Sequence, residues 1–145
     1  MASLIYTSVI EDMARGAVDF DTDTFFVMLT TSSYTENKDT HTKRSDITNE
    51  VSGTGYTAGG QAVVPTIAKD TATDRVTITF PTVTWPSSTI TARKAVYYKR
   101  RGGAASADEL VCVNDEFGGT GTSADVTTSA ATFTLNATSV RFQNY

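Results

Sequence analysis

Apolar residues recur at helical spacing over the first part of the chain. Six of them fall on one side of a helix drawn over residues 4–17: Leu4, Ile5, Val9, Ile10, Met13 and Ala17. The opposite side carries Glu11, Asp12 and Arg15. Ser3 precedes the pattern as an N-cap, and Gly16 stands near its end. The pattern therefore predicts one N-terminal amphipathic α-helix.

A near-continuous apolar run follows at Thr24–Thr30, after a polar turn over residues 18–23. The run has the length of a strand but lacks alternation, which is typical of a strand buried on both faces. We expect the helix to cover one face of this strand and a second sheet to cover the other.

From Gln61 onward the pattern is that of short strands separated by turns. Arg75–Phe80 alternates with period two, so Val76, Ile78 and Phe80 should point inward. Pro65 interrupts the strand at 62–68 and favours an edge position, and Pro86 should end a short strand at 83–85. Further strands are expected at 88–92, 95–99, 110–113, 132–135 and 140–142, with loops at 100–108 and 117–123. We predict a single mainly β domain over residues 1–145, an antiparallel β-sandwich or barrel-like pair of sheets with one N-terminal α-helix and a long ordered loop.

A polar stretch of about thirty residues, 31–60, separates the apolar run from the later strands, with a short helical turn expected at Ser45. Long loops inside compact domains are commonly functional, or become ordered against a partner. Tyr34 and Tyr56 lie in this loop, and tyrosine offers a large contact area with a polar tip. We interpret the loop as an interaction segment, with these two residues as partner contacts.

The residue composition and the net charge limit the classes of protein to which this chain can belong. The 145 residues include 27 Thr and 12 Ser, whereas only 19% are charged and the net charge is −4. Non-specific nucleic-acid binding requires a positive field, so we expect no direct contact with nucleic acid. We also expect no membrane span, because no run reaches 18 apolar residues, and no secretory signal at the N-terminus. The single Cys112 excludes an internal disulfide and fits assembly in a reducing cytoplasm.

No pattern in the chain predicts catalysis, a cofactor or a metal. Asp19, Asp21 and Asp23 begin like a calcium loop, but the required glycine and glutamate are replaced by Thr24 and Thr30. The glycine-rich stretch 53–60 lacks the context of a phosphate-binding loop. His41 is the only histidine, so zinc has no ligand set, and Cys112 between two valines is expected to be a buried, inert thiol.

Three charged side chains are candidates for partner contact. Arg100 and Arg101 follow Lys99 at the predicted hairpin loop, where they could meet an acidic surface. His41, in the long loop, could make a contact there sensitive to pH.

Several stretches together resemble small virion structural proteins of tailed double-stranded DNA bacteriophages. The resemblance covers about residues 4 to 118. It rests on the helix leading into Phe20–Asp23, on Phe26–Thr35, on Asp39–His41, on Asn49–Gly60, on Val83–Trp85 and on Ser88–Lys99. It implies a virion component on the capsid surface, assembled in the bacterial host cytoplasm. The first choice is a capsid decoration or cement protein that binds the major capsid protein or other virion proteins as a homo-oligomer, with a trimer favoured.

Two other functions stay open at this stage. One is a tail or head–tail junction structural protein. The other is a fibre-associated receptor- or glycan-binding module, for which exposed Trp85 or Tyr97 would be the stacking residues; a tryptophan is more often buried in the core. We predict that the protein is not an enzyme, because no acid/base or nucleophile constellation is present.

Overall fold

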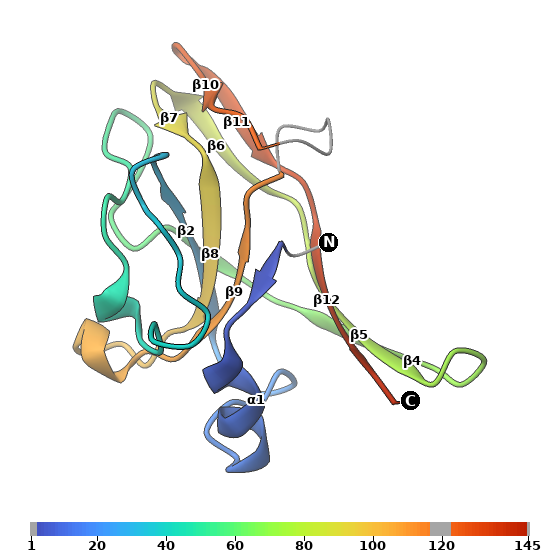
Figure 1. Cartoon of the computed structure of the whole chain (residues 1–145). Coiled ribbons are helices and arrows are strands. Elements are labelled where there is room, and N and C mark those ends of the chain that lie inside the picture. The colour runs from blue at the N-terminus through green and yellow to red at the C-terminus, as the bar shows by residue number, and fades with distance from the viewer. Residues whose placement is uncertain (1–2, 117–122, 145) are drawn as a thin grey trace.

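The computed structural model describes residues 3–116 and 123–144 of the chain (Figure 1). The predicted loop at 117–123 therefore lies outside the described residues except for Ser123. The helical elements are α1 (Thr7–Ala14), η1 (Arg44–Asp46) and η2 (Ala105–Ala107). The strands are β1 (Leu4–Ile5), β2 (Phe25–Thr30), β3 (Gln61–Val63), β4 (Thr66–Asp70), β5 (Arg75–Phe80), β6 (Val83–Ser88), β7 (Thr91–Ala92), β8 (Lys94–Lys99), β9 (Leu110–Asn114), β10 (Val126–Thr127), β11 (Ala131–Leu135) and β12 (Thr138–Gln143).

The prediction of a mainly β fold with antiparallel sheets and one N-terminal α-helix is confirmed, and the described strands form no closed barrel. One layer is a five-stranded sheet in the order β1-β9-β8-β2-β3. The other is a long antiparallel ribbon in which β5 and β6 run beside β12 and β11. The register of the ribbon is unchanged across its short break, since Phe80 pairs with Thr138 and Val83 pairs with Leu135.

The main core lies between these layers. Odd-numbered residues of β2 point into it, and Phe25 contacts Phe80 of the ribbon at 5.9 Å between ring centroids. At the other end of the ribbon, Trp85 packs edge-on against Phe133 at 5.8 Å. Burial of such large rings is the main source of stability for a fold of this size.

A second, smaller core lies on the opposite face of the five-stranded sheet. Met28 of β2 and Tyr98 of β8 point into it, so the prediction that the apolar run is buried on both faces is confirmed. The expected cover is wrong, however. Val9 of α1 belongs to the main core, and the second core is closed by Tyr34 and Ile47 of the long loop.

The helix is shorter than its apolar pattern predicts. Leu4 and Ile5 pair with Val113 and Cys112 of β9 as an edge strand, so the helix begins only at Thr7. Ser3 accepts a hydrogen bond from the backbone of Asp115 and caps nothing, and Ile10 is 55% exposed rather than buried. The helix ends at Ala14 with Arg15 as its C-cap, so Ala17 lies outside it; Gly16, predicted near the end, follows the cap with a positive φ of 74°.

The two prolines behave differently from each other. Pro65 separates β3 from β4, and both are edge strands, as predicted. Pro86 does not end β6, which continues to Ser88. The reason is a shift in register between β6 and β11 at this point, where the ladder needs no N–H from the proline.

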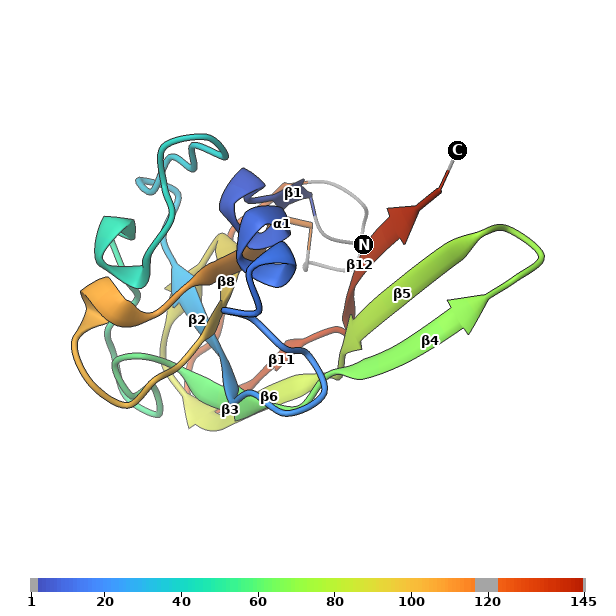
Figure 2. The ribbon, with the colours of Figure 1, turned by 90° about the horizontal axis from the view of Figure 1, so that it is seen from below.

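The three-stranded sheet β12-β5-β4 extends beyond the rest of the molecule as an arm (Figure 2). Its strands are the outer part of the ribbon, with β4 added at the edge. Ile67 pairs with Ile78, and Ile78 pairs with Val140, so these side chains share one face. Ile78 and Val140 are buried in the main core, whereas every residue of β4 is exposed.

Candidate interaction surface

The apolar face of the arm is buried next to the body, at Ile78 and Val140, but is only partly covered at its edge and outer end. Ile67 is 50% exposed, and Val64, just before β4, is 78% exposed. Val76 and Phe142 are opposite each other on the same face, farther from the body, and are only partly buried. A sheet face with exposed and partly exposed apolar side chains at its edge and outer end is a surface that a partner can bury.

An open hollow of about 510 Å³ lies at the outer end of this face. It is lined by Lys69, Asp70, Thr71, Asp74, Arg75, Val76, Phe142, Gln143 and Asn144. Val76 and Phe142 supply its apolar part, and charged side chains of both signs surround them. Such a hollow can accommodate an apolar side chain of a partner protein, with polar groups of the same partner around it.

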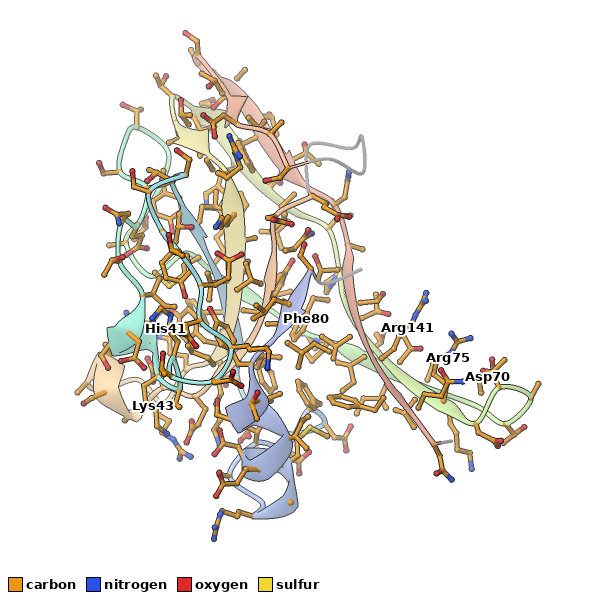
Figure 3. All side chains as sticks on the ribbon, viewed as in Figure 1. His41, Lys43, Asp70, Arg75, Phe80 and Arg141 are labelled. Carbon is orange, nitrogen blue, oxygen red and sulfur yellow. The ribbon has the colours of Figure 1, made fainter. Side chains whose placement is uncertain are left out.

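The opposite face of the arm is polar. Thr79 and Ser139 are hydrogen-bonded at 3.2 Å, and Arg75 lies 3.7 Å from Asp70 across the strand pair. Figure 3 shows Asp70, Arg75 and Arg141 on the arm, well apart from His41 and Lys43 on the long loop. The arm and the loop are therefore two separate surfaces.

Sequence reasoning did not single out the arm. The alternation in Arg75–Phe80 was visible, but it gives no indication that the outer half of the strand passes beyond the body. The available signal was Pro65 directly before β4, since an apolar strand next to a proline is often an exposed edge.

The long loop, residues 31–60, is ordered on its own chain. Isolated bridges join Thr30 to Glu50, Lys43 to Glu109 and Thr54 to Thr89, and η1 forms at the expected helical turn. The segment is thus an ordered loop, held by its contacts with β2 and β9, and its role as an interaction segment stays a prediction.

Tyr34, predicted as a partner contact, is only 1% exposed. Its hydroxyl is 2.7 Å from that of Tyr6 and 2.9 Å from Nδ1 of His41. Burial raises the pKa of Tyr34 to about 12. The ring offers no surface to a partner in this conformation; its role is to hold the loop on the second core.

Tyr56 is also used internally. Its hydroxyl donates to Glu50 at 2.8 Å and accepts the backbone N–H of Leu29 at 3.0 Å. The same carboxylate of Glu50 accepts the N–H of Gly59 at 2.6 Å. Tyr56 thus fastens the glycine-rich part of the loop to β2, while a contact with a partner stays a prediction.

Arg100 and Arg101 lie at the predicted hairpin loop between β8 and β9. The guanidinium of Arg100 lies 4.4 Å from the ring centroid of Phe26, and Arg100 is exposed. Arg101 makes a two-pronged ion pair with buried Glu109, with its shortest N–O distance at 2.6 Å. The charge of Arg101 is thus already compensated within the chain, which leaves Arg100 as the more available of the two.

The residues proposed for glycan stacking are buried. Trp85 is 1% exposed and Tyr97 is fully buried, both in the main core. The prediction that Trp85 is a core residue is confirmed, and the glycan-binding alternative loses both of its named residues. Cys112 is buried as predicted, and burial raises the pKa of its thiol.

The aspartates before β2 form a turn. Asp19 Oδ1 accepts the N–H of Asp21, and Asp23 Oδ2 accepts that of Asp19 and pairs with Lys99 at 2.8 Å. Within residues 3–116 and 123–144, no group of three or more His, Cys, Asp or Glu side chains is arranged to hold a metal ion. No helix in the same residues is long and apolar enough to cross a membrane.

Comparisons with known proteins give no relative. No family model matches the chain, no curated protein matches it, and no solved structure matches it.

Proposed function

We propose that this protein is a non-enzymatic structural protein of a bacteriophage virion, and that it acts as a capsid decoration protein that stabilises the head. Its partners are the major capsid protein and further copies of the chain, with a trimer favoured, on the outer surface of the capsid. The resemblance of residues 4 to 118 to small virion proteins is the starting point. The structural observation that supports it is the arm, whose apolar face is only partly covered at Ile67, Val76 and Phe142 in the single chain.

The arm suits an adhesive role for a physical reason. A projecting apolar sheet face is unfavourable in water, and covering it by a neighbouring subunit recovers about 25 cal/mol for each Å² of apolar surface. A particle with many copies repeats this gain at every site. The rigid two-layer body behind the arm keeps the surface in one orientation, which limits the entropy lost on binding.

The direct test is binding to particles. Purified full-length protein is mixed with capsids assembled without it, and cosedimentation and the heat resistance of the particles are measured. We expect the wild-type chain to bind and to raise the temperature at which capsids open. Ile67→Asp should bind at least about tenfold more weakly, because it places a charge on the contact face.

Ala68→Asp is the matched control. Ala68 is also exposed, but it follows Ile67 directly and points to the polar face of the arm. It should bind as the wild type does. Equal binding by all three proteins would remove the arm from the interface, and no binding by the wild type would contradict the decoration role itself.

A tail or head–tail junction position is the second candidate. The observation that favours it is that the arm leaves the body in one direction, so copies could join arm to body in a ring. Electron microscopy of particles carrying labelled protein separates the two: label over the whole head supports decoration, and label at one vertex or along the tail supports the alternative.

A further inference from the structure

Tyr6, Tyr34 and His41 form a chain of hydrogen bonds between the start of α1 and the long loop. The two hydroxyls are 2.7 Å apart, and the hydroxyl of Tyr34 is 2.9 Å from Nδ1 of His41. The rings of Tyr34 and His41 stack at 5.7 Å between centroids. Both tyrosines are buried, whereas His41 is partly exposed. Of these three residues, therefore, only His41 exchanges protons readily with water.

The backbone N–H of Asn37 fixes which group donates in each of these hydrogen bonds. The N–H of Asn37 lies 3.4 Å from Nδ1 of His41, and a backbone N–H can only donate. Nδ1 is then an acceptor, and the neutral ring carries its proton on Nε2. It follows that Tyr34 donates to His41 and that Tyr6 donates to Tyr34. The hydroxyl hydrogens of Tyr6 and Tyr34 then both have an acceptor.

Protonation of His41 reverses this order. Nδ1 becomes a donor and faces both the N–H of Asn37 and the hydroxyl of Tyr34. Tyr34 must then accept from His41, and only one of the two tyrosine hydroxyls can donate to the other, so the hydrogen of the second hydroxyl must turn away. In the described part of the chain the Tyr6 hydroxyl has no hydrogen-bond partner besides Tyr34. A buried hydroxyl hydrogen is left without an acceptor, which is costly.

The charged groups around Tyr6, Tyr34 and His41 do not provide an acceptor for this hydrogen. Lys94 of β8 lies 5.8 Å from the ring centroid of Tyr34 and is paired with Glu36. Asp46 of η1 attracts a charged His41, but its Oδ2 already accepts the N–H groups of Thr42 and Lys43. On the β9 side, Cys112, whose thiol is buried, pairs across the strands with Ile5, the neighbour of Tyr6. No group of this set is hydrogen-bonded to the Tyr6 hydroxyl in the described part of the chain.

We propose that Tyr6, Tyr34 and His41 form a proton-operated latch for the first part of the long loop. With neutral His41 the latch holds residues 34–41 against the start of α1, where the N–H of Thr7 also donates to the carbonyl of Lys38 at 2.9 Å. With protonated His41 the latch loses its order, and this part of the loop opens more often. The inference does not depend on the proposed virion function, because it concerns the chain alone.

Hydrogen exchange in the full-length protein tests the latch. The amides of Thr7 and His41 report on it, since they donate to Lys38 and Asn37 across the closed segment. Protection, corrected for intrinsic exchange, should fall at least about tenfold between about pH 8 and about pH 5, the range in which histidines take up a proton. Amides of β2 paired with β8 should keep their protection.

His41→Asn is the matched variant, because an asparagine oxygen can occupy the place of Nδ1 and cannot be protonated in this range. Its loop amides should keep their protection as the pH falls. A fall equal to that of the wild type, or no fall in the wild type, would overturn the latch.

A second measurement needs no variant. Nitrogen NMR of the wild-type His41 ring should find Nδ1 unprotonated and Nε2 protonated at about pH 8, the tautomer expected where Nδ1 accepts a hydrogen bond. A proton found on Nδ1 instead would contradict the proposed direction of the chain.

Discussion

Tyr97 and Tyr98 are neighbours on β8, yet their hydroxyl groups bind on opposite sides of the sheet. Tyr97 donates to Oγ1 of Thr138 at 3.0 Å, in the main core. Tyr98 donates to the carbonyl of Gly59 at 2.6 Å, in the second core. Through Tyr97, β8 is thus bonded to the ribbon, and through Tyr98 it is bonded to the long loop.

This relationship predicts unequal effects for two identical substitutions. Tyr98→Phe leaves the buried carbonyl of Gly59 without its partner and should lower the free energy of unfolding by about 1–2 kcal/mol. Tyr97→Phe should cost less, because Thr138 Oγ1 keeps the hydrogen bond from Asn114 at 2.8 Å. Urea unfolding of the three proteins measures the difference. A larger loss for Tyr97→Phe would contradict this account.

Two glycines with similar backbone angles should respond differently to alanine. Gly60 has a φ of 79°, and a Cβ there would lie 1.7 Å from the carbonyl oxygen of Val27. Gly102 has a φ of 83°, with nothing within 4 Å of the same position. Gly102→Ala should cost about 1 kcal/mol, the ordinary strain of a positive φ, and Gly60→Ala should cost about 3 kcal/mol or more. Thermal unfolding compares them, and equal losses would show that the close approach to β2 is unimportant.

The arm predicts a contrast between two paired isoleucines. Ile78 is 2% exposed in the main core, and its partner Ile67 is 50% exposed. Ile78→Ala should lower the free energy of unfolding by about 2–4 kcal/mol, whereas Ile67→Ala should lower it by less than about 1 kcal/mol. If Ile67→Ala proves equally destabilising in the isolated chain, then its face of the arm is covered and is not a contact surface.

Glu109 makes the stability of the protein depend on acid pH. Burial alone would raise the pKa of Glu109, but the hydrogen bonds of Arg101 and the charges of Lys43 and Arg101 bring it below its ordinary value of 4.5. The folded state therefore gains stability from this carboxylate above that value. The gain is lost as the pH falls from 4.5 through the lower pKa of the folded state.

The matching variant is Glu109→Gln. It should be less stable than the wild type at neutral pH by about 1–3 kcal/mol, because Arg101 and Lys43 lose a charged partner next to a buried site. The difference should shrink as the pH approaches 3, since the wild-type carboxylate is then being protonated as well. Urea midpoints measured at several pH values test both parts. A constant difference across this range would exclude Glu109 as the source.

The pattern of apolar residues predicts the fold class and most of the strands. The run at Thr24–Thr30 is buried on both faces as predicted, and Ile78 and Phe80 point inward, because burial on one or two faces has a direct signature in the sequence. Val76 is only partly buried, since its part of β5 lies in the arm. The shorter helix was missed because Leu4 and Ile5 satisfy a helical pattern and an edge strand equally well. Only their pairing with β9 decides between the two.

The surfaces were harder to predict than the strands. Tyr34 and Tyr56 stand in a polar stretch that lacks periodicity, so their burial depends on contacts with Tyr6 and Glu50, which are distant or unmarked in the sequence. Ile67 has the apolar character of a core residue, and only the way β4 extends past the body leaves it in water. Local pattern predicts which residues can be buried, and tertiary geometry determines which of them are.

The uninterrupted register between β5 and β12 limits how the arm can vary in length. Side chains alternate between its faces along β5 and β12, so adding one residue to a strand would exchange the apolar and polar faces beyond that point. Insertions of two residues in each strand would keep Val76 and Phe142 on their present side. Homologues with a longer or shorter arm should therefore differ by an even number of residues in each of the two strands. Engineered arms of altered length should keep to the same rule.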